Sequence, residues 1–204
     1  ATYQRNQEAV ESENRFVLKC KNTDRVLLFT DKGNMHQIKC QDVPLGKFKD
    51  KGVPIDNISK YNANQEEIIY ANVKSALAGK TLIFATRDAM VKLVETSEFE
   101  TADKLVAATK LGEGDRLIEI REMAYETDIV FETHDGYFLR CSLSDIPLQK
   151  KNSKGVIGIR LGKCDTLEHF YLLGTEPVEI SYRKKPLSLN RLKLAGRAGK
   201  GTKH

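Results

Sequence analysis

Apolar and polar positions recur in register along this chain. Three stretches align without gaps: VLLFTDKGNMHQIKCQDVP from Val26, LIFATRDAMVKLVETSEFE from Leu82 and IVFETHDGYFLRCSLSDIP from Ile129. In each stretch an apolar run ends at a Thr, a short polar turn follows, and a second, more alternating run comes next. Runs of this length, rich in β-branched and aromatic residues and joined by a turn, predict a β-hairpin. The first run is apolar at successive positions, which predicts a strand covered on both faces.

Further strands are expected around the hairpins. One is predicted before each hairpin, at residues 16–21, 68–73 and 117–121. Another follows a Lys-Gly step in two of the units, at 53–58 and 156–161, whereas the remaining unit has Ala107-Ala108 there and lacks the step. Several strands in a period of about 50 residues predict a propeller-like array, in which stacked units cover one another's faces.

The period divides the chain into units. Residues 1–24 are expected to be the end of a truncated first blade with its lead-in strand, followed by blades at 25–80, 81–127 and 128–167. A looser last blade with a basic tail is expected at 168–204. Helical signals are weak, and residues 8–14 are expected to form at most one turn. Because the chain starts at Ala1 without an initiator Met, we expect it to be a piece of a longer protein.

Positive charge is concentrated at the end of the chain, in residues 183–204, which we call the basic tail. The tail holds eight Lys or Arg residues and no Asp or Glu, whereas residues 1–182 hold the other 25 basic residues and all 28 acidic ones. A local positive field of this kind suits a polyanion, and a solvated surface charge is the alternative reading.

Other chemistry is not supported by the residues present. The four cysteines, Cys20, Cys40, Cys141 and Cys164, form no CxxC pair, and the four histidines are scattered, so we expect reduced thiols and no metal site. The stretch GRAGKGT near the end lacks the spacing of a P-loop. We therefore expect no cofactor and no catalytic residue in this chain. The apolar runs are too short for a membrane helix, and we expect a cytoplasmic, nucleoid-associated protein.

The unit consists of an apolar strand, Thr, a turn with Gly, a second strand, Asp, Pro and a basic loop ending in Lys-Gly. This pattern resembles the repeat in the C-terminal domain of the A subunits of bacterial DNA gyrase and topoisomerase IV, which are type IIA topoisomerases. The resemblance implies an all-β fold, a β-pinwheel of about four to five blades whose neighbours exchange a strand. It also implies a non-catalytic module that bends duplex DNA and presents a segment for strand passage. The implied partners are double-stranded DNA, the ATPase B subunit, and the N-terminal cleavage domain that precedes this domain in the same chain.

One departure from the family bears on the kind of enzyme. Gyrase carries a loop of the type QRRGGKG, and no copy here matches it in full. The nearest stretch, Gly196 to Thr202, reads GRAGKGT and lies in a shortened loop. This departure favours a topoisomerase IV assignment over gyrase.

Candidate DNA contacts are the basic residues of the predicted loops, because Lys and Arg replace counterions around phosphates without reading sequence. We expect the glycines beside them to let the backbone lend N–H groups to phosphate. The candidates are Lys47, Lys49, Lys51, Lys150, Lys151, Lys154, Arg183, Lys184, Lys185, Arg191, Lys193, Arg197, Lys200 and Lys203. Lys92 and Arg140 are left out because they fall on second strands of the hairpins.

Two alternatives remain open at this stage. A propeller-like scaffold for protein interactions would suit the near-neutral charge of residues 1–182. An enzyme with a site in a central channel would need His or carboxylate groups on inner strands, and the inner strands here are apolar.

Overall fold

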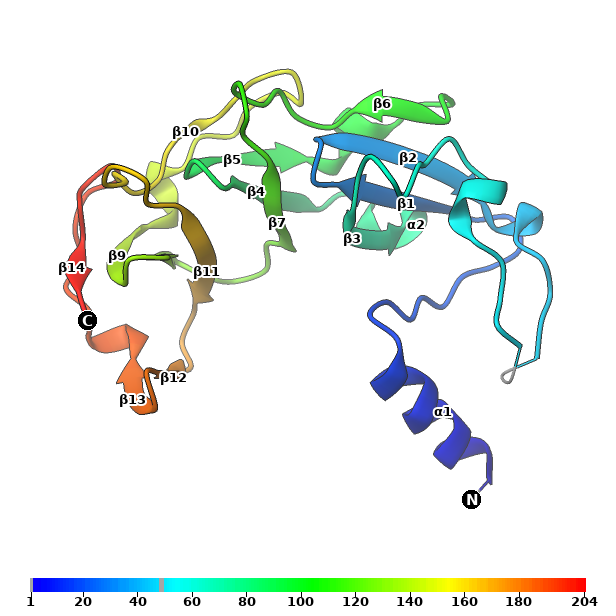
Figure 1. The fold of residues 1–204 in the computed structure, drawn as a ribbon, viewed down its shortest axis with the longest axis horizontal. Helices are drawn as coiled ribbons and strands as arrows, with labels where there is room; N and C mark the ends of the chain where they lie inside the picture. The colour runs from blue at the N-terminus through cyan, green and yellow to red at the C-terminus, as the bar shows by residue number, and fades with distance from the viewer. Residues whose placement is uncertain (1, 48–49) are drawn as a thin grey trace.

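The computed structural model describes residues 2–47 and 50–204, with side chains described from residue 8. Its strands form three four-stranded sheets and one two-stranded sheet, which follow one another along an open arch (Figure 1). The all-β repeat predicted from the sequence is therefore confirmed. The sheets are antiparallel throughout, as short hairpin connections require.

The three four-stranded sheets share one plan, with the hairpin in the middle. The first has the order β3-β1-β2-β6, with β1 Arg25–Thr30, β2 Asn34–Lys39, β3 Ile68–Val73 and β6 Leu105–Ala107. The second has the order β10-β5-β4-β7, with β4 Thr81–Thr86, β5 Met90–Glu95, β7 Leu117–Glu122 and β10 Val156–Ile157. The third has the order β11-β8-β9-β14, with β8 Asp128–Thr133, β9 Tyr137–Ser142, β11 Leu167–Leu173 and β14 Thr202–Lys203.

The remaining elements are short. β12 (Glu179–Tyr182) and β13 (Lys185–Ser188) form the two-stranded sheet. The helices are α1 Thr2–Glu13, α2 Lys74–Leu77 and the 3₁₀ turns η1 Cys40–Asp42, η2 Ile55–Asn57, η3 Thr96–Phe99, η4 Leu143–Asp145 and η5 Leu189–Arg191. A 3₁₀ turn directly follows the second strand of every hairpin, where the chain leaves the sheet.

Each blade takes its fourth strand from the following repeat. β6 comes after the hairpin β4–β5 in the chain but pairs with β2 of the preceding blade. β10 pairs with β5 and β14 pairs with β9 in the same way. Equivalent residues pair in the three blades: Val106 with Met35, Val156 with Val91, and Thr202 with Phe138. We call β6, β10 and β14 the exchanged strands.

The hydrophobic cores lie between blades. Phe29 of the first blade meets Phe84 of the second edge to face, with ring centroids 6.0 Å apart. Ile83 of the second blade and Phe131 of the third belong to one buried cluster. A single hairpin could not bury both faces of its apolar strand, so the stacking of neighbours provides the cover that the sequence pattern required.

Several local expectations are wrong. Residues 16–21 form no strand, and residues 53–58 hold η2 instead of a strand. The strand predicted at 156–161 is limited to Val156–Ile157. The described residues of 1–12 lie in α1, whose polar sequence includes the helix formers Gln and Glu. The helix is longer than the single turn expected at 8–14. The division into units otherwise stays a prediction, since each sheet combines two of them.

Candidate nucleic-acid interface

A lysine occupies the same place before each exchanged strand. Three lysines stand two residues before the equivalent paired residues Val106, Val156 and Thr202. They are Lys104, Lys154 and Lys200. All three are exposed, and the exchanged strands are edge strands of their sheets. We call these three residues the rim lysines. The Lys-Gly pattern in the sequence did not include Lys104, because Leu105 and not Gly follows it. The pairing of β6 with β2 shows that Lys104 holds the same position as Lys154 and Lys200.

The glycine after Lys154 or Lys200 has a packing role. Gly155 has φ +92° and Gly201 has φ +76°, conformations that side chains rarely adopt. A Cβ at Gly155 would lie 2.6 Å from the carbonyl oxygen of Val91, and one at Gly201 would lie 2.4 Å from that of Phe138. The Lys-Gly step therefore lets the chain approach the preceding blade closely, which is a different role from the phosphate binding predicted for these glycines.

The loop before Lys154 is held by a buried lysine. Lys92, on β5, is 1% exposed, and its ammonium group donates to the carbonyl oxygens of Lys150 (3.1 Å), Lys151 (2.9 Å) and Ser153 (2.8 Å). Burial lowers the pKa of Lys92 to about 8, although the charge of Glu98 opposes this shift. Three convergent carbonyl dipoles satisfy the ammonium group and fix the path of the loop backbone.

The other second strands hold the following repeat in a similar way. Gln37 of β2 donates to the carbonyl oxygens of Thr101 and Asp103, both at 3.3 Å. Arg140 of β9 pairs with Asp128 and donates to the carbonyl oxygen of Leu192 at 3.3 Å. One polar side chain per blade thus orders the segment that leads to the next exchanged strand.

Two of the predicted contact residues are engaged by Glu98 on η3. Lys150 forms an ion pair with the Glu98 carboxylate at 3.0 Å, and the Lys151 ammonium group donates to the Glu98 carbonyl at 2.9 Å. Hydrogen bonds from Lys150 and Lys151 lower the pKa of Glu98. Lys154, by contrast, is exposed and has no polar partner among the described residues.

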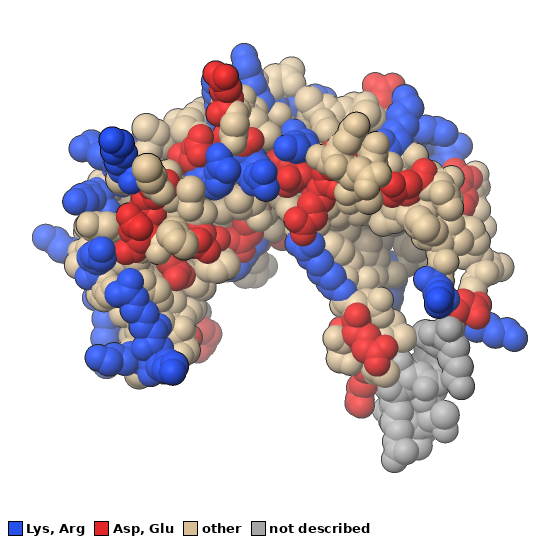
Figure 2. Space-filling model, in the orientation of Figure 1, with Lys and Arg blue, Asp and Glu red and all other residues tan. Residues whose placement is uncertain are grey.

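The basic tail gathers most of the remaining candidates. Lys200 and Lys203 place their ammonium groups 5.0 Å and 5.4 Å from the centre of the Tyr137 ring. Arg183 lies 5.1 Å over the ring of Tyr182 and donates to the backbone oxygen of His204 at 3.0 Å. Figure 2 shows Lys and Arg side chains crowded on this limb of the arch, while basic and acidic side chains mix over its middle.

The other candidates are dispersed. Lys184, Lys185, Arg191 and Lys193 are exposed on the last unit, whereas Arg197 donates to the carbonyl oxygens of Asp145 (3.2 Å) and Ile157 (2.7 Å) and so holds the loop to the blade. Lys47 and Lys51 are exposed on the loop of the first repeat. Lys49 lies outside the described residues.

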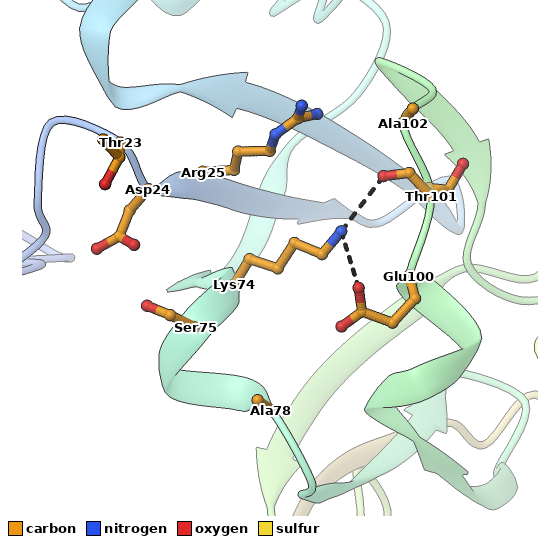
Figure 3. Close-up of a pocket in the computed structure, with 9 residues that line it drawn as sticks. All are labelled: Thr23, Asp24, Arg25, Lys74, Ser75, Ala78, Glu100, Thr101 and Ala102. Atoms are coloured by element: carbon orange, nitrogen blue, oxygen red, sulfur yellow. Dashed lines mark hydrogen bonds and ion pairs between the residues drawn. The ribbon is translucent and has the colours of Figure 1, made fainter.

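One cavity lined by described residues lies between the start of β1, α2 and the segment that follows η3. The cavity in Figure 3, of about 480 Å³, is lined mostly by polar residues of mixed charge. Lys74 pairs there with Glu100 at 3.2 Å and donates to the carbonyl oxygen of Thr101. In the described part of the chain, no group of three His, Cys, Asp or Glu side chains could hold a metal ion. No described helix is long and apolar enough to cross a bilayer.

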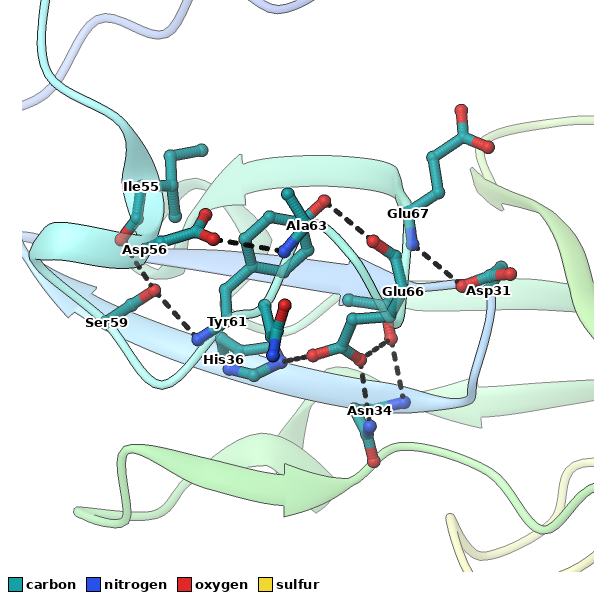
Figure 4. A network of polar contacts seen from close by, with 12 residues as sticks. Asp31, Asn34, His36, Ile55, Asp56, Ser59, Tyr61, Ala63, Glu66 and Glu67 are labelled. Atoms are coloured by element: carbon teal, nitrogen blue, oxygen red, sulfur yellow. Dashed lines mark hydrogen bonds and ion pairs between the residues drawn. The ribbon is translucent and has the colours of Figure 1, made fainter.

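A buried polar cluster in the first blade is structural in character (Figure 4). The Glu66 carboxylate accepts from Thr30 (2.7 Å) and Asn34 (2.9 Å), and its other oxygen lies 2.6 Å from Nε2 of His36. Burial acts to raise the pKa of Glu66, but these hydrogen bonds and the neighbouring His36 outweigh it and lower the pKa. The cluster ties both strands of the hairpin to the segment that precedes β3.

The fold and its repeated exchanged strands define a β-propeller domain of the pinwheel type. Residues 24–73, 80–121 and 127–173 match the family model described as "DNA gyrase C-terminal domain, beta-propeller". Because these segments cover more than half of the chain, the chain belongs to this family.

Relatives of both enzyme types are similar to the chain. The A subunit of DNA gyrase from Lawsonia intracellularis is 34% identical over 70% of this chain, and that from Streptococcus pyogenes is 35% identical over 60%. The A subunit of DNA topoisomerase 4 from S. pyogenes is 25% identical over 91% of this chain. The chain spans between 15% and 24% of the length of these relatives.

Solved structures show the same fold. The C-terminal domain of DNA topoisomerase IV matches 98% of this chain and 67% of that structure, with a TM-score of 0.82 and 23% identity. The E. coli ParC C-terminal domain gives a TM-score of 0.77 over 92% of this chain and 79% of that structure, with 17% identity. A DNA gyrase A C-terminal domain gives 0.67 over 90% of this chain and 60% of that structure, with 16% identity.

Proposed function

We propose that this chain binds duplex DNA without sequence preference and bends it along the edge formed by the exchanged strands. The observation that carries this proposal is the exposed lysine recurring at one register position in all three four-stranded blades, followed by the basic tail at the end of the arch. Bending a short duplex costs about 1–6 kcal/mol, so contacts spread over several blades suit the task better than one strong site.

The parent enzyme, on this proposal, is a type IIA topoisomerase whose A subunit uses this domain to present a DNA segment for strand passage. The domain supplies no catalytic residue and no cofactor site. Cleavage belongs to the N-terminal domain of the same subunit, whereas ATP hydrolysis belongs to the B subunit. These partners follow from family membership and are inferences for this chain.

A topoisomerase IV-like role is favoured over a gyrase role. The absence of a full QRRGGKG loop supports this choice, and so does the higher TM-score to the topoisomerase IV domain than to the gyrase domain. The sequence identities point the other way, since the gyrase relatives reach 34–35% over a smaller part of the chain. We give the loop more weight, because it bears directly on wrapping.

Binding of a short and a long duplex across a salt series tests the proposal. Affinity is expected to be independent of sequence, higher for the longer duplex, and to fall with salt with a slope of about −0.9 per neutralised phosphate. Absence of binding at low salt would overturn the proposal. It would favour a protein-interaction scaffold, for which the near-neutral charge of residues 1–182 is the supporting observation.

A further inference from the structure

The loop of residues 150–154 holds three lysines, and an acidic residue of the preceding repeat contacts two of them. The loop leads into the exchanged strand β10 and reads Lys-Lys-Asn-Ser-Lys. Nζ of Lys150 lies 3.0 Å from Oε1 of Glu98, and the other carboxylate oxygen of Glu98 accepts from the backbone N–H of Lys151 at 3.1 Å. The ammonium group of Lys151 also donates to the backbone oxygen of Glu98 at 2.9 Å. Both carboxylate oxygens of Glu98 are therefore occupied by this loop.

Glu98 is held within the protein, whereas the side chain of Lys150 reaches into solvent. The Glu98 side chain is 18% exposed and that of Lys150 is 83% exposed. Hydrogen bonds from Lys150 and from the backbone of Lys151 lower the pKa of Glu98, so its carboxylate stays charged at neutral pH. An ion pair with so exposed a partner is weak. Lys150 can therefore exchange Glu98 for another anion at little cost.

The position that Glu98 occupies is acidic in three repeats and basic in the last. It is the third residue of the 3₁₀ turn that follows the second strand of each hairpin, and its occupants are Asp42, Glu98, Asp145 and Arg191. Arg197, from the loop of the last unit, donates to the backbone oxygen of Asp145 at 3.2 Å. This contact matches the one from Lys151 to Glu98. The charge of the position is reversed in the last unit, which carries the basic tail.

We propose that Glu98 limits the affinity of this edge for DNA by competing with phosphate groups for Lys150. The inference rests on the proposed function, because it concerns the same loop and the same ligand. A phosphate that takes over Lys150 leaves the Glu98 carboxylate without its cation, so a cation must be taken up from solution. This uptake cancels part of the cation release from DNA that favours binding. Lys154, which is exposed and makes no ion pair among the described residues, bears no such cost.

Glu98→Gln tests the competition directly. The amide keeps the shape of the carboxylate, and its oxygen can still accept from the N–H of Lys151, while the charge is lost. Anisotropy titrations are expected to show duplex affinity raised by about 3–5-fold at low salt, and a salt slope steeper by about 0.9, because Lys150 is released. A lower affinity would show that Glu98 serves to order the loop, and an unchanged affinity would show that Lys150 is not held back. Either result would overturn the proposal.

Two further variants separate competition from simple repulsion of DNA by an acidic residue. Glu100→Gln removes the same charge close by in the chain, from a side chain that pairs with Lys74 at 3.2 Å. It should change affinity by less than about 1.5-fold. In a Lys150→Gln background, Glu98→Gln should have an equally small effect, since the lysine to be released is gone. A gain of the same size in both backgrounds, or from Glu100→Gln, would contradict the proposal.

The parent protein distinguishes failure of this proposal from failure of the proposed function. If neither the parent nor Glu98→Gln binds duplex at low salt, the proposed function is wrong, and the role of Glu98 falls with it. If the parent binds and Glu98→Gln binds equally well, the DNA-binding function stands and only the role of Glu98 is rejected.

Discussion

The ammonium nitrogen of Lys92 lies 2.8 Å from the carbonyl oxygen of Ser153, which belongs to the following repeat. A buried charge of one blade thereby holds the loop that carries an exposed lysine, Lys154, at the edge of the sheet. Lys92 itself cannot reach solvent, so its influence on DNA binding is expected to be indirect.

Replacing Lys92 with Met should separate loop ordering from charge. We expect the free energy of unfolding to fall by about 1–3 kcal/mol, since three carbonyl groups lose their donor. We expect DNA affinity to fall several-fold, because binding must then order part of the loop, and ordering a single residue costs about 1–2 kcal/mol. The slope of affinity against salt should stay unchanged, which anisotropy titrations with labelled duplex would measure.

Lys154→Gln is the matched comparison, because it removes the same charge. It should leave stability unchanged and make the salt slope shallower by about 0.9. If Lys92→Met also reduced the slope by this amount, Lys92 would be acting as a phosphate contact, and the loop-ordering explanation would be wrong.

The rim lysines should act together. Changing Lys104, Lys154 and Lys200 to Gln is expected to lower affinity by about 3–10-fold for each residue at low salt, and to do so equally for unrelated sequences. Lys74→Gln, which removes a charge already paired with Glu100, serves as the control and should change affinity little. A triple variant that binds like the parent would place the DNA elsewhere.

Gly201→Ala should lower the free energy of unfolding by more than the conformational strain of an added methyl group alone. The new Cβ would lie 2.4 Å from the carbonyl oxygen of Phe138 at a φ of +76°, so β14 would be pushed from its blade. We expect a loss above about 2 kcal/mol in chemical unfolding, against about 1 kcal/mol for the conformational strain alone. Gly114→Ala, at φ +70° with nothing within 4 Å, measures that strain and should cost clearly less.

Acid should weaken the first blade through Glu66. Because the folded state lowers the pKa of this carboxyl group below its ordinary value of 4.5, its contribution to stability is complete above that pH. The contribution is lost as the pH falls through the lowered folded pKa. Glu66→Gln should therefore be less stable than the parent at pH 7 by about 1–3 kcal/mol, with a difference that shrinks in acid. Thermal unfolding from pH 7 to pH 3 measures this, with exposed Glu113→Gln as control; a difference that grew in acid would contradict it.

The hairpins could be predicted from sequence because their signals are local. Thr30, Thr86 and Thr133 mark the ends of apolar runs, and all three runs are strands that end at these residues. The strands that follow were harder to predict. Residues 53–58 and 156–161 look alike in sequence, yet only Val156–Ile157 forms a strand, because only that segment meets the edge of a preceding hairpin.

The candidate interface, like the fold, could be predicted only where local sequence determines the structure. Loop position and charge were enough to select Lys154 and Lys200, both exposed. They could not show that Arg197 is bonded to the backbone of Asp145 and Ile157, or that Lys104 shares the register of the other two. Both facts depend on which strand of a neighbouring repeat lies alongside, which no local pattern encodes.

The exchanged strands also fix the order in which the blades can be completed during synthesis. Since β6, β10 and β14 each lie one repeat downstream of the blade they complete, a blade emerging from the ribosome stays open at one edge until the next repeat has been made. Folding during synthesis must therefore lag one repeat behind the growing chain. A nascent chain stopped after Leu173 would leave the blade of β8 and β9 without β14. Interrupted translation therefore leaves this blade one strand short, although its own hairpin has been made in full.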